Sequence, residues 1–195
     1  MKFFDKIQVS TVDHSGGVLI NNGVFAGLAQ GTGEQDRIGR KIICKSLFLR
    51  GHIRLLDHSG ATFPDYNMIR IMVIEDRQCN GANATTAEIF ETPPIGPDLI
   101  SSFNNLANKN RFKTHLDKFV PLNYTTLSGT TNLYASGKLI PFKFFKKLNI
   151  PVEFSGTGTS TISNIQSSNL FVFLWTVTAD LNVQFDCISR VRFVG

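Results

Sequence analysis

The chain has 195 residues, of which 42% are hydrophobic and 18% are charged, and it contains 17 phenylalanines. This composition excludes a disordered chain, and the length suits a single domain, residues 1–195, with a substantial core. The net charge of +5 comes from 20 Lys and Arg against 15 acids, which suits a polyanionic partner without requiring one. No apolar run reaches the roughly 18 residues of a membrane span, and the first residues do not resemble a secretion signal.

Stretches of alternating apolar and polar residues follow one another along the chain, and this period of two is typical of β-strands. The segments between them are rich in Gly, Ser, Thr and Asp, as turns are. In chain order, the predicted strands are residues 7–11, a weaker candidate at 18–28, and residues 37–56, 68–77, 111–122, 138–148, 169–177 and 181–194.

Helix is scarce in this pattern. Residues 85–91 predict a short helix capped by Thr85 or Thr86, and residues 97–109 predict another. About eight strands with two short helical insertions favour an all-β fold, either an antiparallel sandwich or a jelly roll.

The segment 37–56 alternates an apolar face with a basic one. From Ser46 onward, the even positions include Arg50, His52 and Arg54, whereas Leu47 and Leu49 stand on the other face. The last predicted strand alternates more regularly still. Its apolar side begins with Leu181, Val183, Phe185 and Cys187, and its polar side ends with Arg190 and Arg192.

The three cysteines have neither the even number nor the CxxC spacing of a disulfide framework or a zinc site. Cys44 and Cys187 lie within strand patterns and are predicted to be small core residues. No metal or cofactor is expected. The acids Glu75, Asp76, Glu88 and Glu91 have no EF-hand spacing, and they are interpreted as solvated loop acids in preference to a calcium site at a subunit contact.

No residue pattern favours an enzyme. His14 and His58 both occur in Asp-His-Ser-Gly, but adjacent residues cannot converge as a catalytic triad does, so these segments are predicted to be turns. The glycines of GTGEQDRIGR match neither a dinucleotide-binding fingerprint nor a phosphate loop.

Positive charge is gathered in sets along the strands. One interpretation is a set of solvated strand edges, where Lys prevents unwanted pairing. However, the segment KFFKK, residues 143–147, places cations beside aromatic rings, a mixture that holds a phosphate backbone and stacks bases.

The order of these segments resembles the coat proteins of small circular single-stranded DNA viruses, whose capsids are akin to that of satellite tobacco necrosis virus. The resemblance covers nearly the whole chain. It is carried by RIGRKIICKSLFLRGHI, MIRIMVIEDRQCNGANATTAEIF, NRFKTHLDKFVPLN, KKLNIPVEFSGT and SNLFVFLW, in that order.

The resemblance implies one eight-stranded antiparallel jelly roll with short helical insertions in its loops, whose strands include residues 3–12 and a short one near Val152. It implies self-assembly into a virion shell of about 60 copies around a single-stranded genome, DNA in preference to RNA. Loops such as 57–65, 91–98 and 128–132 would surround the symmetry axes or face outward.

The first and last strands of a jelly roll pair, so Lys2 and Lys6 are expected near Arg190 and Arg192 on the genome-facing side. Together with Lys143, Lys146 and Lys147, these residues are the predicted nucleic-acid-binding set. Such coat proteins begin with an arginine-rich arm, whereas this chain enters its first strand almost at Met1. Either the arm is missing from this sequence, which the small net charge favours, or the genome is packaged without one.

Two other functions fit the strand pattern. A sandwich domain that binds carbohydrate or a receptor as a monomer or trimer leaves the basic residues unused. Its aromatic residues, Trp175, Tyr66, Tyr124 and Tyr134, are too scattered for a sugar platform. An enzyme of the cupin type would need clustered His and carboxylate ligands, which the sequence lacks.

Overall fold

The computed structural model describes residues 1–12, 18–19, 22–55, 67–91, 102–122, 139–156, 158–176 and 183–195. Seven strands have eight residues or more, and β2 has two. The elements are β1 (Lys2–Val12), β2 (Val18–Leu19), β3 (Lys41–Leu55), β4 (Asn67–Asp76), α1 (Thr86–Ile89), β5 (Phe112–Leu122), β6 (Ile140–Glu153), β7 (Asn169–Thr176) and β8 (Val183–Val194), with 3₁₀ turns at Leu106–Asn108 and Ile162–Asn164.

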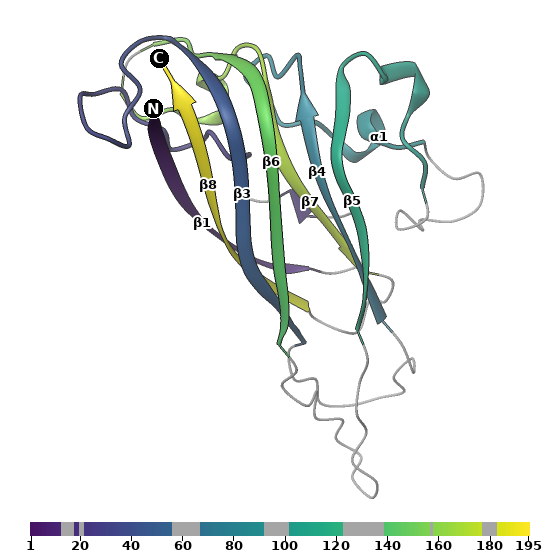
Figure 1. Ribbon diagram of the computed structural model, residues 1–195. Helices are drawn as coiled ribbons and strands as arrows, with labels where there is room; N and C mark the ends of the chain where they lie inside the picture. Colours follow the sequence, from purple (N-terminus) through teal and green to yellow (C-terminus); the bar gives the residue numbers. More distant parts are fainter. Residues whose placement is uncertain are drawn as a thin grey trace, which may run out of the picture.

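The strands form two antiparallel sheets that lie one behind the other (Figure 1). Sheet A has the strand order β1-β8-β3-β6, and sheet B has the order β2-β7-β4-β5. The prediction of an all-β, antiparallel structure is therefore confirmed. The first and last strands, β1 and β8, pair along their whole length, as expected.

The alternation seen in the sequence turns one side of each sheet toward a shared apolar core. Leu47 and Leu49 of β3 and Ile71 and Val73 of β4 are fully buried members of one continuous cluster. Cys44 and Cys187 belong to the same cluster, as predicted. Burial raises the pKa of each thiol to about 12, so both behave as small apolar side chains.

Strand β7 is buried on both faces, which explains why its sequence is almost continuously apolar. On the side away from sheet A, Phe90 packs edge-on against Trp175, with ring centroids 4.7 Å apart. Phe90 follows α1, whose N-terminus is capped by Thr85 through a capping box with Glu88, as the sequence predicted for Thr85.

A β-bulge at Lys45 changes which residues of β3 face the core. The pairing of β3 with both neighbours shifts between Cys44 and Ser46. Before the bulge the even residues Ile42 and Cys44 are buried, and after it the odd residues Leu47 and Leu49 are. An alternation without a break would bury Ile43 with Leu47 and Leu49, but Ile43 is exposed.

Four predicted elements differ from the structure. The expected short strand near Val152 is the end of β6, which is continuous through Pro151. As an edge strand, β6 tolerates prolines that a central strand would not. Among the described residues of the 18–28 segment, only Val18–Leu19 is strand, and the buried residues Val24 and Phe25 lie in turns.

The second predicted helix, residues 97–109, is reduced to the 3₁₀ turn Leu106–Asn108 within its described part. Asn105 caps that turn by accepting a hydrogen bond from the backbone of Ala107, so the turn starts there. The Asp-His-Ser-Gly segments and most of the loops expected around symmetry axes lie outside the described residues.

The strand expected to begin at Arg37 begins at Lys41, because the side chain of Arg37 binds loop residues outside the strand. Its buried guanidinium lies 4.6 Å from the centre of the Phe154 ring and donates hydrogen bonds to the carbonyls of Gly39 and Gly156. Burial lowers the pKa of Arg37, and the nearby positive charge of Arg40 adds to this effect. Arg37 thus joins two loops at the end of the sheets and is not a surface cation.

Candidate nucleic-acid interface

The side of sheet A that faces away from the core, called here the outer face, carries a regular grid of side chains. Paired residues in an antiparallel sheet project to the same side, so the strand register fixes the grid. Its rows, read across β6, β3, β8 and β1, are Lys147–Ser46–Arg192–Phe3, Phe145–Phe48–Arg190–Asp5, Lys143–Arg50–Ile188–Ile7 and Pro141–His52–Asp186–Val9.

The cations of the outer face outnumber its acids. Asp5 accepts two hydrogen bonds from Arg190, at 2.7 and 2.5 Å. Asp186 lies 3.2 Å from His52 Nε2 and 3.7 Å from Arg54 Nε. Within the described part of the chain, the remaining cations of the grid have no hydrogen-bonding or ion-pair partner; they are Arg50, Lys143, Lys147 and Arg192.

Two of these cations face each other directly. Arg50 on β3 is paired with Lys143 on β6, and both side chains are exposed. Like charges at directly opposed positions destabilise a sheet. The arrangement therefore has a cost in the free protein, and a bound anion between the two cations would remove it.

Aromatic rings lie among these cations. Phe48 and Phe145 contact edge to face, with centroids 6.5 Å apart, and Phe145 is 54% exposed. The Lys143 ammonium lies 5.9 Å from the Phe48 centroid, and the Arg190 guanidinium lies 4.9 Å from that of Phe3. Cations spaced between partly exposed rings are the arrangement that holds a phosphate chain while bases stack on aromatic side chains.

Two shallow hollows mark the outer face. One, of about 450 Å³, lies over Ser46 between Phe145 and Arg192, where the small serine side chain leaves room among larger neighbours. The other, of about 490 Å³, lies over Gly51 between Arg50 and Ile188. Both are bordered by Phe48 and Arg190, so they form neighbouring parts of one surface.

The structure brings together four of the seven predicted nucleic-acid-binding residues. Lys143, Lys147, Arg190 and Arg192 all lie on the outer face. Lys146 does not, because it is paired with the core residue Leu47 and so projects to the inner side of sheet A, at its edge.

Lys2 and Lys6 are near Arg190 and Arg192 along the paired strands, as expected, but they project to the opposite side of the sheet. Lys6 is paired with the buried Ser189, and Lys2 with the buried Phe193. Their ammonium groups donate hydrogen bonds to the carbonyls of Gly23 and Gly33, respectively. Burial lowers the pKa of Lys6 to about 8. The placement of Lys2 and Lys6 on the same side as the two arginines was therefore wrong.

The predicted set omitted Arg50 and the three aromatic residues Phe3, Phe48 and Phe145. The alternation in residues 37–56 had already placed Phe48 and Arg50 on one basic face. What the sequence lacked was the register, which brings Phe3 and Phe145 from distant strands into the same grid.

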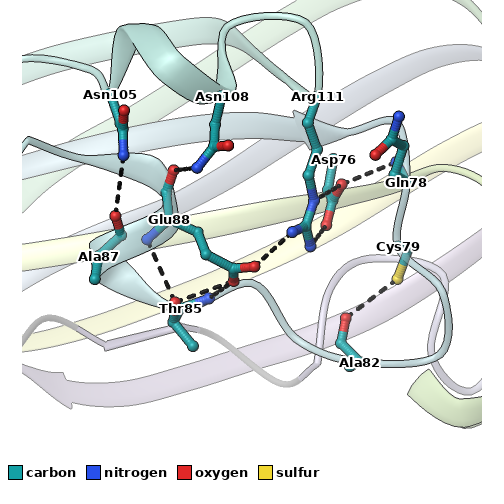
Figure 2. Close-up of polar contacts among 10 residues, drawn as sticks. All are labelled: Asp76, Gln78, Cys79, Ala82, Thr85, Ala87, Glu88, Asn105, Asn108 and Arg111. Atoms are coloured by element: carbon teal, nitrogen blue, oxygen red, sulfur yellow. Dashed lines mark hydrogen bonds and ion pairs between the residues drawn. The ribbon is translucent and has the colours of Figure 1, made fainter.

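The acids interpreted as solvated loop residues are mostly part of β4 and of a buried ion cluster. Asp76 is fully buried and accepts two hydrogen bonds from Arg111, each of 2.9 Å (Figure 2). Glu88 of α1 accepts another from Arg111, at 2.5 Å. Hydrogen bonds to Asp76 above all, and to Glu88, raise the pKa of Arg111. The cluster joins α1 to sheet B.

Glu75, the remaining acid of β4, is also buried and pairs with His115 at 2.7 Å. Among the described residues, no group of three or more His, Cys, Asp or Glu side chains is placed to hold a metal ion. In the same ranges, no helix is long and apolar enough to cross a membrane.

Comparison with known proteins found no matching family model and no matching curated protein. The chemistry of the outer face is therefore the basis on which a function is assigned.

Proposed function

We propose that this protein is a viral coat subunit that assembles into a closed shell and binds single-stranded nucleic acid, DNA in preference to RNA, through the outer face of sheet A. The binding rests on the placement of four cations around partly exposed phenylalanines, namely Arg50, Lys143, Lys147 and Arg192. In the described part of the chain, no acid neutralises them.

The strand order supports a jelly roll with eight strands. Two four-stranded sheets face each other, and the first and last strands lie side by side in one of them. This interpretation counts the two-residue β2 as the eighth strand, beside β7. A jelly roll presents loops at both ends of the sheets and free edges at the sides, all of which are available for contacts between copies.

The binding chemistry follows from the grid. Each cation that meets a phosphate releases condensed counterions, so affinity depends on salt and not on base sequence. The partly exposed rings of Phe48 and Phe145 supply apolar surface for bases, which single strands expose and duplexes do not. Nothing on the outer face provides a groove-reading helix, in keeping with nonspecific packaging of a genome.

Assembly would raise the overall affinity for nucleic acid. In a shell of about 60 copies, each outer face needs only modest affinity, because many copies hold one polymer. The outer face of sheet A would then line the inside of the virion, and the loops at the ends of the sheets would contact neighbouring subunits.

The test is the salt dependence of binding to an oligothymidylate. In a triple variant, Arg50, Lys143 and Arg192 are each changed to Gln. In a control variant, Arg40, Lys109 and Lys118 are changed to Gln, which lowers the net charge equally at exposed positions off the outer face. The slope of log K against log salt should fall by about 2 in the first variant and stay unchanged in the second. Equal losses in both variants would contradict the assignment.

A further inference from the structure

A second basic site lies where the two sheets open at one side. The hollow there, of about 460 Å³, is called the edge hollow, and its polar lining includes Glu75, Arg77, Lys113, His115, Lys146 and Lys147. Its walls are the edge strands β5 and β6, which end sheets B and A and do not pair with each other (Figure 1).

Lysines from both sheets project into the space between them. Lys113 is paired with Glu75, whose side of β4 faces the core, and Lys146 is paired with the core residue Leu47. The two ammonium groups therefore approach the edge hollow from opposite walls. Lys147, the next residue along β6, borders it as well. In the described part of the chain, none of the three lysines makes a hydrogen bond or a salt bridge.

Glu75, the one carboxylate that lines the edge hollow, already has two basic partners. Glu75 lies 2.7 Å from His115 Nε2 and 3.4 Å from Arg77 Nε. Burial alone would raise the pKa of Glu75, but the hydrogen bond and charge of His115, with Arg77 and Lys113, lower it overall. Even with Glu75 ionised, the four cations of Arg77 and the three lysines leave positive charge uncompensated.

Backbone irregularities shape both walls. On β5, His115 is the extra residue of a bulge, because Val73 pairs with Leu116 and Ile74 with Thr114. On β6, Leu148 and Asn149 stand opposite the single residue Lys45, whose ammonium donates to Asn149 Oδ1 at 2.6 Å. Bulges redirect side chains and occur beside functional sites more often than elsewhere. Here His115, Leu148 and Asn149 all line the edge hollow.

We propose that the edge hollow is a binding site for a phosphate group, which bridges the lysines of the two sheets. Phosphate fits because it carries more than one charge and offers oxygens in several directions, whereas each lysine is a compact donor on a flexible stem. Its oxygens would accept from Lys113 on one wall and Lys146 on the other, and the anion would compensate the charge that Glu75 does not.

This site shares Lys147 with the outer face but does not depend on the coat-protein assignment. Lys147 connects the two surfaces, because it also stands in the row of Ser46 and Arg192. The phosphate could therefore be a free inorganic ion or a group on a nucleic acid that passes around the edge of β6. The chemistry recognised is the same in both cases.

Binding of inorganic phosphate is measured by calorimetry and by the NMR signals of the His115 ring, at constant ionic strength in chloride. The wild type should show saturable binding and a shift of the His115 signals. A variant with Lys113→Gln and Lys146→Gln should bind at least about tenfold more weakly. The matched control, with Arg40→Gln and Lys118→Gln at exposed positions that line neither the edge hollow nor the outer face, should keep the wild-type affinity.

Absence of saturable binding by the wild type would overturn the proposal, as would equal weakening in both variants. A thermal-shift series guards against misfolding, because both double variants remove exposed lysine or arginine charges and should melt as the wild type does in chloride. An oligothymidylate is then added to the phosphate complex. Both outcomes support the site: displacement assigns the phosphate to a nucleic acid, and retention assigns it to a free ion. The oligothymidylate binding lost by the triple variant at Arg50, Lys143 and Arg192 tests the proposed function independently.

Discussion

Arg50 on β3 and Lys143 on β6 lie directly opposite each other in sheet A, although both are exposed cations. A sheet selected for stability alone would place an acid at one of these positions, because opposed unlike charges are favourable and like charges are not. The pair is therefore the clearest local sign that the outer face is shaped for an anionic partner.

Reversing one of these charges should separate stability from binding. Arg50→Glu should raise the free energy of unfolding by about 0.2–1 kcal/mol, because the new carboxylate would face Lys143, while weakening oligothymidylate binding. Arg54→Glu is the control, since Arg54 already contacts Gln184 and Asp186 and its reversal should lower stability. Urea denaturation and a binding titration check both effects. A loss of stability in Arg50→Glu would refute the interpretation of the pair.

Phe145 should contribute to binding through base stacking. Phe145→Ala should weaken oligothymidylate binding by about 1–3 kcal/mol, the usual contribution of one stacked base, with little change in unfolding because the ring is 54% exposed. Val9→Ala, at an equally exposed aliphatic position on the same face, should leave binding unchanged. Fluorescence anisotropy of a labelled oligothymidylate measures both, and equal effects would argue against stacking.

The Asp76–Arg111–Glu88 cluster should be needed for folding and not for binding. Arg111→Met leaves the fully buried Asp76 without its cation and should lower the free energy of unfolding by about 3–5 kcal/mol. Arg192→Met, which removes an exposed and unpaired arginine, should change it by less than about 0.5 kcal/mol. Urea denaturation compares the two, and a small effect of Arg111→Met would show that the cluster is dispensable.

Lys6 should make stability depend on alkaline pH. Its folded pKa is about 8, below its ordinary value of 10.5, so between these pH values the unfolded chain binds the additional proton and stability rises with pH. Relative to Lys6→Met, the wild type should gain about 1–2 kcal/mol from pH 7.5 to 10, with allowance for partial exposure. Paired urea denaturations over this range measure the difference. A difference independent of pH would contradict the burial of a charged Lys6.

The strands and their order along the chain could be predicted from the sequence because alternation with a period of two survives in nearly every strand. The bulge at Lys45 could not, since it inserts one residue without leaving a compositional mark and is visible only once partners are paired. The sequence divided β6 into a strand at 138–148 and a short one near Val152, whereas the edge position of β6 lets the strand continue through Pro151.

The candidate site could be predicted in part, because alternation within a strand also shows which of its residues share a side of the sheet. Antiparallel pairing of the first and last strands placed Lys6 near Arg190, but a shift of one residue decides which side of a sheet a residue occupies. In KFFKK, alternation alone implies that Lys146 and Lys147 project to opposite sides. The meeting of Phe3 with Arg190 depends on a register that no single strand encodes.

Electron microscopy of the purified protein is the direct test of whether it forms a closed shell that holds nucleic acid. The ratio of absorbance at 260 and 280 nm is recorded on the same sample. We expect uniform round particles, with a high ratio that falls in the triple variant at Arg50, Lys143 and Arg192. Monomers or small oligomers under all conditions of salt and pH would contradict it.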